Sequence, residues 1–228
     1  MKVVLVLLGL VITGLGLTTL NFRQHAKTAT SSVDSLRFTD SVLKARNAAL
    51  TAALDTQLAA VSRQKEAELN QLRSTYDQLV DSMKDEISQG QIQITRLADR
   101  LSVSMVDKIL FPSGEAGITT AGLRILQRVG AVLKTTEGKI IRVEGHTDNV
   151  AISDKLKSTF ATNWELSTAR ATNVVRFLQD SVGIDATRLQ AVGLSQYHPV
   201  APNTTVQGRS QNRRIEIALL PLEKTPQP

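Results

Sequence analysis

Three carboxylates and a histidine in one short stretch of the sequence have the clearest capacity for chemistry. They are Glu144, His146, Asp148 and Asp154. Two such carboxylates could in principle act as the acid and the base of a hydrolase. The sequence supplies no zinc constellation, no cysteine–histidine pair and no serine–lysine motif to accompany them. A hydrolase is therefore the weaker hypothesis, and we expect no enzyme activity.

The same stretch gives a weak hint of a metal site. His146 and Asp148 are two residues apart and could share a face. Two ligands without a third nearby histidine or cysteine make a poor metal site. The sequence therefore predicts neither a metal nor a cofactor, and His146 is expected to pack or to hydrogen-bond within its loop.

Composition excludes several classes of partner. The chain has no cysteine, so thiolate metal sites, disulfides and an acyl-cysteine lipid anchor are excluded. Its formal net charge is +6, but the basic residues form no run interleaved with aromatics, which make up only 4% of the chain. The electrostatic footprint of a nucleic-acid-binding protein is therefore missing, and we expect no nucleic acid partner.

Residues 102–220 have the pattern of a globular domain. Alternating or short apolar runs predict strands at 102–111, 139–144, 189–192 and 213–219. A helix capped by Thr119 or Thr120 and another capped by Ser167 are expected between them. The order β-α-β-α-β-β predicts an α+β fold, with helices packed on a mixed sheet. Residues 102–220 are expected to fold without the segment before them, and residues 221–228 to form a flexible tail.

Residues 31–101 are expected to form a long helix. They contain no proline and one glycine, Gly90, and their apolar residues recur at spacings of three and four. This pattern is typical of a coiled-coil stalk, which needs a partner for its apolar stripe. We expect a homodimer. A helical hairpin is the alternative, with a weak turn signal at 88–90.

The N-terminal residues 1–24 are expected to be a signal anchor or transmembrane helix. Residues 3–20 carry no charge. An uncharged stretch of this length is about the minimum for a helix that spans a bilayer. A cleaved signal peptide is the alternative, and it would leave a soluble periplasmic protein. Arg23 and Lys27 oppose the positive-inside tendency, so the nature of the C-terminal domain must decide the orientation.

Four short segments carry a resemblance to a known family. They are LFPSG (110–114), VEGHTDN (143–149), NWELSTARA (163–171) and GRSQNRRIEI (208–217). In this order and with these gaps they resemble the OmpA-like C-terminal domain, which is also found in the flagellar stator protein MotB and the lipoprotein Pal. The longer stretch between Asp148 and Asn163 is most similar to the MotB-like branch.

The resemblance implies helices on a mixed sheet and non-covalent binding of peptidoglycan through the diaminopimelate of its stem peptide. The positions that match the family's ligand groups are Asp148 and Arg170, with support from Asn163, Thr147, Leu166 and Arg213. Where many relatives have an asparagine in the first motif, this chain has Gly114, so one side-chain contact is expected to be missing.

Elementary chemistry agrees with this assignment. The far end of diaminopimelate is a free amino acid, with one ammonium and one carboxylate. Asp148 could accept from the ammonium, and Arg170 could donate two parallel hydrogen bonds to the carboxylate. If Ser167 caps its helix, Arg170 lies in the first turn, where unpaired backbone N–H groups also attract an anion.

The sequence therefore predicts a non-catalytic tether between the cell envelope and the cell wall. We expect a single-pass protein of the inner membrane with a periplasmic C-terminal domain. An accessory or stator-like subunit of a membrane motor or transport complex is the alternative. A proton-driven stator needs an intramembrane carboxylate, and residues 3–20 contain none.

Overall fold

The structure is a computed structural model that describes residues 2–97 and 100–222, with the backbone alone for residues 2–14. The chain divides into two compact units, Met1–Gln64 and Lys65–Pro228. The boundary between the units falls within the first helix, α1 (Lys2–Ser82).

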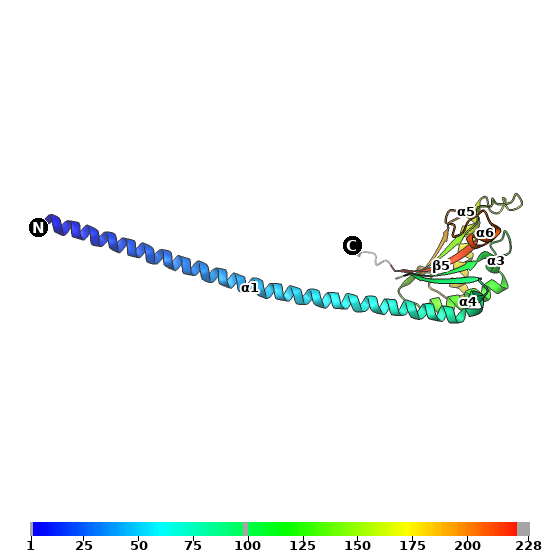
Figure 1. Cartoon of the computed structure of the whole chain (residues 1–228), viewed down its shortest axis with the longest axis horizontal. Coiled ribbons are helices and arrows are strands. Elements are labelled where there is room, and N and C mark those ends of the chain that lie inside the picture. Colours follow the sequence, from blue (N-terminus) through cyan, green and yellow to red (C-terminus); the bar gives the residue numbers. More distant parts are fainter. Residues whose placement is uncertain (1, 98–99, 223–228) are drawn as a thin grey trace. The chain divides into compact units, whose positions relative to one another are not determined.

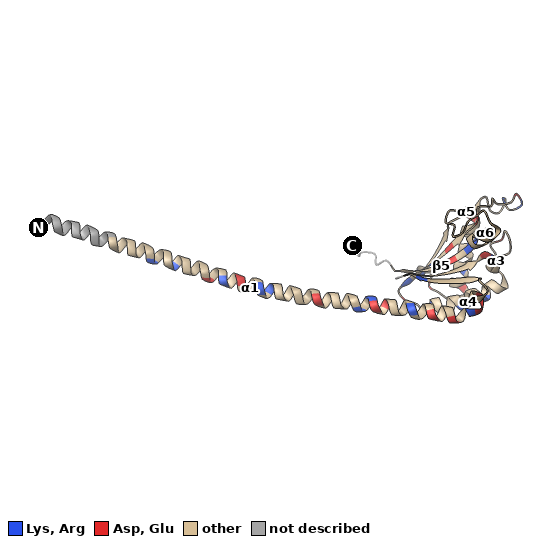
Figure 2. Cartoon of the chain, in the orientation of Figure 1, with Lys and Arg blue, Asp and Glu red and all other residues tan. Residues whose placement is uncertain are grey.

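The first unit is the N-terminal part of α1 (Figure 1). Its side chains are exposed from Leu15 onward, and the leucines of the predicted stripe are more than half exposed: Leu36, Leu43, Leu50, Leu54 and Leu58. Basic and acidic residues are interspersed along it (Figure 2). A helix of this length thus leaves an apolar stripe without a partner within its own unit.

The predicted membrane anchor falls mostly on side chains that the structure does not describe. Residues 3–14 of the uncharged stretch lie outside the described side chains. In the part of the chain that the structure describes, no helix has the length and apolarity needed to cross a bilayer. The anchor and its cleaved alternative both stay predictions.

The second unit is built on a five-stranded sheet. Its strands are β1 (Ile92–Leu97), β2 (Arg100–Val106), β3 (Lys139–His146), β4 (Leu189–Gly193) and β5 (Arg214–Pro221). Their order is β1-β2-β5-β3-β4. The β3–β4 pair is parallel and the other three pairs are antiparallel. The prediction of a mixed sheet is confirmed.

Helices cover the apolar face of this sheet. The long ones are α4 (Thr120–Lys134) and α5 (Asn163–Phe177), which continues as a π-helical turn (Leu178–Val182). Shorter elements are α2 (Lys84–Ser88), α3 (Asp107–Leu110), a 3-10 turn (Ala186–Arg188) and α6 (Val206–Asn212). Leu126, Val174 and Leu178 pack in one core cluster with the strand residues Val143 and Ile217. The predicted packing of helices on one sheet is thus confirmed.

The end of α1 belongs to this core. Leu72, Leu79 and Met83 are fully buried in the same cluster as the helices and strands. Thr75 lies 3.3 Å from Thr136, and the Arg128 guanidinium donates to the Ser82 carbonyl at 3.0 Å. The core of the second unit therefore begins well before residue 102.

The prediction of continuous helix to residue 101 was wrong. The helix ends at Ser82, and Gly90, at φ +66°, precedes strand β1. In β1, Ile92 and Ile94 alternate with polar residues and face the core, while the strand pairs with β2. Apolar residues two apart satisfy a strand as well as they continue a loose heptad, and tertiary pairing decides between them.

Of the two predicted helix caps, the one for α4 is confirmed and the one for α5 is wrong. Thr119 caps α4, as predicted, and its side chain accepts from the Gly122 N–H. Ser167 does not cap α5. Thr162 is the cap, in a capping box with Glu165, so Ser167 lies one turn inside the helix. The buried Ser167 hydroxyl instead accepts from the Ser195 N–H at 3.1 Å.

Close contact between α5 and β3 fixes the loop that follows β3. A Cβ at Gly145 would lie 2.2 Å from the Ser167 carbonyl oxygen, a separation that no side chain can adopt. Glycine therefore lets the helix backbone rest directly on the strand. Asp148, three residues later, is held beside the first turn of α5.

Candidate functional site

Asp148 lies at the carboxyl end of β3 with both carboxylate oxygens engaged. One oxygen accepts from the Val150 N–H at 3.0 Å, which fixes the turn. The other accepts from Arg213 Nη1 at 2.5 Å. The Asp148 side chain is only 8% exposed, whereas that of Arg213 is 36% exposed. Arg213 is thus the accessible partner of this pair.

Arg170 is buried in the interior of α5 and is 3% exposed. Its Nε donates to the Glu115 carbonyl at 2.9 Å, and its Nη1 donates to Asp107 Oδ2 at 3.1 Å. The guanidinium lies over the Phe111 ring, 4.9 Å from the centroid. Its remaining nitrogen, Nη2, has no partner among the described residues and stays free to donate.

Asp107 joins these two pairs into one chain of alternating charges. Its Oδ2 accepts from Arg170, and its Oδ1 lies 3.6 Å from Arg213 Nε. The order of charges is therefore Arg170, Asp107, Arg213, Asp148. Burial raises the pKa of Asp107, although both arginines act against that rise, and burial lowers the pKa of Arg170. Each charge is tolerated in this buried place because it has opposite neighbours.

Three of the predicted supporting residues position this chain. Asn163 Nδ2 donates to the carbonyls of Asp148 at 3.3 Å and Val150 at 3.0 Å, and so ties the loop to α5. Leu166 is buried in the next turn of the helix. The Thr147 N–H donates to the Ser195 carbonyl at 2.9 Å, whereas its buried hydroxyl has no partner among the described residues.

The comparisons with known proteins agree with this arrangement. Residues 110–213, which include Arg170, Asp148 and Arg213, match the model of the OmpA family. The chain carries an OmpA-family domain.

Named relatives of the domain are proteins of motility and of the cell wall. The chain is 33% identical over 157 residues to Motility protein B of Bacillus subtilis, an alignment that covers 69% of this chain and 59% of that protein. A MotB-like protein from Desulfovibrio vulgaris has a similar structure, with a TM-score of 0.63 and 26% identity over 72% of this chain and 99% of that one. The cell wall anchor of the T6SS from Pseudomonas aeruginosa gives a TM-score of 0.56 and 33% identity, covering 63% of this chain and 97% of that one. The chain spans about six tenths of the length of the curated relatives that it matches first.

The OmpA-family domain thus brings together most of the residues that the sequence singled out. Asp148 and Arg213 are in direct contact, Asn163 holds their loop, and Arg170 reaches them through Asp107. The expectation that Arg170 lies in the first helical turn was wrong, because the cap is Thr162 and not Ser167. Attraction of an anion by the helix N-terminus therefore does not act at Arg170.

Asp107 is the site residue that the sequence analysis missed. It stands three positions before the LFPSG motif, within a run predicted to be a strand to residue 111. The strand in fact ends at Val106, and Asp107 opens the short helix α3. An acid immediately after an alternating strand is the signal that could have pointed to it. Gly114, in the same motif, has a φ of +75°, a conformation that glycine adopts without strain.

Among the described residues, one group of three possible metal ligands lies close together. It differs from the pair of His146 and Asp148 that the sequence suggested. Glu144, His146 and Glu216 place their ligand atoms within 4.8 Å of one another on neighbouring strands. Arg100 lies 3.9 Å from Glu144 and 3.7 Å from Glu216, and Arg214 lies 3.6 Å from Glu216. Because these arginines already neutralise the carboxylates, the cluster is better explained as an ion-pair network, and the predicted absence of a metal stays a prediction.

His146 is buried, with its ring edge-on to His198. Neither ring nitrogen has a hydrogen-bond partner among the described residues, and Nε2 lies 3.8 Å from Glu144 Oε2. Of the two expectations for this side chain, packing is therefore the one that the structure supports.

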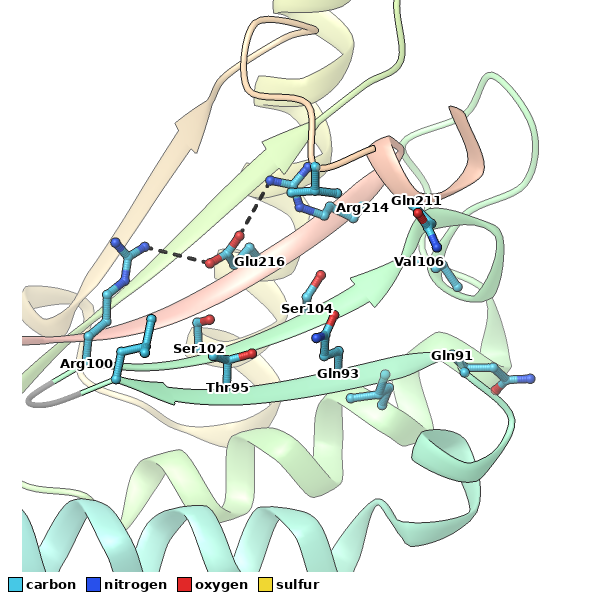
Figure 3. A pocket seen from close by; sticks show the side chains of 14 residues that line it. Gln91, Gln93, Thr95, Arg100, Ser102, Ser104, Val106, Gln211, Arg214 and Glu216 are labelled. Carbon is cyan, nitrogen blue, oxygen red and sulfur yellow. Dashed lines mark ion pairs between the residues drawn. The ribbon is translucent and has the colours of Figure 1, made fainter. Parts of the chain in front are cut away.

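A pocket of about 480 Å³ opens on the polar face of the sheet, away from the predicted site. Figure 3 shows Gln93, Thr95, Ser102, Ser104 and Glu216 lining it from β1, β2 and β5. Its charged members are the arginines and the glutamate of the ion-pair network, whose charges are mutually compensated. None of the predicted ligand residues lines this pocket.

Proposed function

We propose that the protein is a non-catalytic tether that binds peptidoglycan through the diaminopimelate of its stem peptide. The observation that carries this proposal is the Asp148–Arg213 pair, in which a fixed carboxylate meets a partly exposed guanidinium. The free amino-acid end of diaminopimelate carries the same two charges. The ligand could therefore replace an internal ion pair with two external ones, without leaving a charge unpaired.

The residues of the charge chain have distinct roles in this proposal. Asp148 accepts from the ligand ammonium after the Arg213 side chain moves aside, which its exposure allows. Arg213 and the free Nη2 of Arg170 donate to the ligand carboxylate. Asp107 lies between the two guanidinium groups and compensates the charge of both, since it contacts both. Asn163, Thr147 and Leu166 keep the loop and helix at a fixed separation.

The location follows from the ligand. Peptidoglycan lies outside the inner membrane, so we place the OmpA-family domain in the periplasm. An uncleaved N-terminal segment would make the protein a single-pass protein of the inner membrane, and cleavage would make it a soluble periplasmic one. The exposed leucine stripe of α1 supports a homodimer through a coiled coil.

A stator-like or accessory subunit of a membrane complex is the second candidate. The likeness to Motility protein B and to a T6SS cell wall anchor favours it. A torque-generating stator is less well supported, because residues 3–20 contain no carboxylate that could carry a proton.

Sedimentation with purified sacculi tests the main proposal. Asp148→Ala and Arg213→Ala should each weaken binding by about 2–5 kcal/mol, because each leaves a ligand charge without its partner. Asp154→Ala is the matched control, since that carboxylate is 93% exposed and pairs with the exposed Lys157. Binding that is unchanged in both site variants would move the site elsewhere. Release of soluble muropeptides above the level of the Asp148→Ala variant would show a hydrolase instead.

A further inference from the structure

Two exposed aromatic rings stand beside the proposed peptide site. Trp164 is 44% exposed and Tyr197 is 63% exposed. Their ring centroids are 5.5 Å apart and their planes differ by 30°, so the rings form one tilted, solvent-facing pair. Trp164 comes from the first turn of α5 and Tyr197 from the loop after β4. Neither ring is needed to fill the core cluster.

This aromatic pair is tied to the Asp148 loop by the residues next to it. Asn163 precedes Trp164, and Gln196 precedes Tyr197. The Asn163 amide donates to Gln196 Oε1 at 3.3 Å as well as to the Asp148 carbonyl. One side chain therefore links both aromatic segments to the loop that carries the proposed ligand carboxylate.

We propose that Trp164 and Tyr197 form a sugar-binding platform that takes the pyranose ring to which the bound stem peptide is attached. This proposal rests on the proposed function and extends it from the peptide to the glycan. The apolar C–H faces of a pyranose pack on aromatic faces, and the hydroxyl of Tyr197 keeps a polar tip in solvent.

The covalent structure of the ligand brings the sugar within reach of this platform. Diaminopimelate is the third residue of a peptide whose first residue is joined to the muramic acid sugar. Three extended residues span at most about 11 Å. A peptide gripped at Asp148 must therefore hold its sugar close by, and the aromatic pair offers an apolar surface there. The platform carries no charge of its own, which suits a neutral ring better than a charged partner.

The test compares two ligands on the full chain. One is the free diaminopimelate-containing stem peptide, and the other is the same peptide attached to its disaccharide. We expect the disaccharide form to bind about threefold to tenfold more tightly. Trp164→Ala and Tyr197→Ala should remove this gain in calorimetric titrations and leave the affinity for the free peptide unchanged. Trp164→Phe keeps an aromatic face and should keep most of the gain.

Intrinsic fluorescence gives an independent readout, because Trp164 is the only tryptophan of the chain. The disaccharide form should change its emission, and the free peptide should not. In Tyr197→Ala the emission change should need a higher concentration of the disaccharide form.

The outcomes separate the two proposals. Tight binding of the free peptide, with no gain from the disaccharide, would overturn the platform and leave the proposed function standing. The platform would also be overturned if the alanine variants bind both ligands as the wild type does, as expected of a surface for a protein partner. Failure of the wild type to bind either ligand would overturn the proposed function, and the platform with it.

Discussion

Arg170 is held in place by the fold and keeps one nitrogen available to the proposed site. Its guanidinium is held by the Asp107 carboxylate, by the Glu115 carbonyl and by the face of Phe111. Three contacts fix its orientation and leave one nitrogen free. A buried arginine of this kind is a rigid donor, whereas the half-exposed Arg213 can move.

Removing Arg170 should therefore destabilise the domain. We expect Arg170→Ala to lower the free energy of unfolding by about 3–5 kcal/mol, because Asp107 would stay buried without its closest counter-charge. Urea denaturation followed by circular dichroism measures this change. Arg176→Ala, two turns later on the same helix and exposed, should change stability by less than about 0.5 kcal/mol. Equal small effects of both substitutions would show that the Arg170–Asp107 pair contributes little.

At the scale of single residues, sequence motifs could predict Asp148, Arg213 and Asn163, which the fold brings together. They could not predict Asp107 as the link between them. Asp107 and Arg170 are 63 residues apart, and their contact depends on how α3 and α5 meet. The role of Arg170 was misjudged for a local reason, since Thr162 and Ser167 are both acceptable caps and only the capping box with Glu165 separates them.

Among the elements, the contact of β3 with α5 is the one that positions the site. Gly145→Ala should cost more than about 3 kcal/mol, because the new methyl group would overlap the backbone carbonyl of Ser167, which cannot rotate away. Gly117→Ala is the control, since a Cβ there meets no atom within 4 Å. Thermal unfolding of the two variants makes the comparison. A Gly145→Ala variant as stable as Gly117→Ala would mean that the helix moves off the strand at little cost.

The sheet also carries a pH-dependent contribution to stability. Glu144 and Glu216 face each other directly across β3 and β5, a repulsive arrangement that nearby cations must offset. His146 and then Arg100 lower the pKa of Glu144, against burial, which raises it. The folded state thus favours the ionised carboxylate more than the unfolded chain does. This contribution is present above the ordinary pKa of 4.5 and is lost as the pH falls through the lower folded value.

Glu144→Gln should reveal this contribution. The difference in unfolding free energy between the wild type and Glu144→Gln should be largest above about pH 5 and should shrink as the pH falls toward about 3. Urea titrations across this range give the difference. Asp154→Asn, at a fully solvated carboxylate, should show no such trend. A constant difference at all pH values would indicate that Glu144 acts through packing alone.

Most elements of the second unit could be predicted from sequence, and the exceptions share a cause. The strands β3, β4 and β5 and the helix α4 have unambiguous apolar periods and caps. In β1 the local pattern favours helix instead, because Ile94 and Leu97 continue the spacing of the upstream stripe. Its strand character depends on pairing with β2, which no local pattern reveals.

Considered over the whole molecule, the apolar stripe of α1 serves two purposes. Its last part, with Leu72 and Leu79, packs in the core of the second unit. A chain that begins at residue 102 should therefore lose cooperative unfolding, because it lacks these side chains and strand β1. A chain that begins at residue 65 should keep it. Differential scanning calorimetry of the two chains checks this, and a cooperative transition in the shorter one would show that the α1 contacts are dispensable.

The first part of the stripe is exposed within its own unit, so we expect another chain to cover it. Leu36, Leu43 and Leu50 are each more than half exposed, and their seven-residue spacing is that of a coiled-coil seam. A chain that begins at residue 31 should therefore sediment as a dimer, and a chain that begins at residue 65 as a monomer.

Replacing Leu43 and Leu50 by lysine places like charges in the seam, and the longer chain should then dissociate. Two lysines at the exposed polar positions Ser41 and Ser62, which lie off this seven-residue repeat, serve as the control and should leave the dimer intact. A monomer at all concentrations for the unmodified longer chain would leave the stripe to another protein, since α1 forms no helical hairpin within which it could be buried.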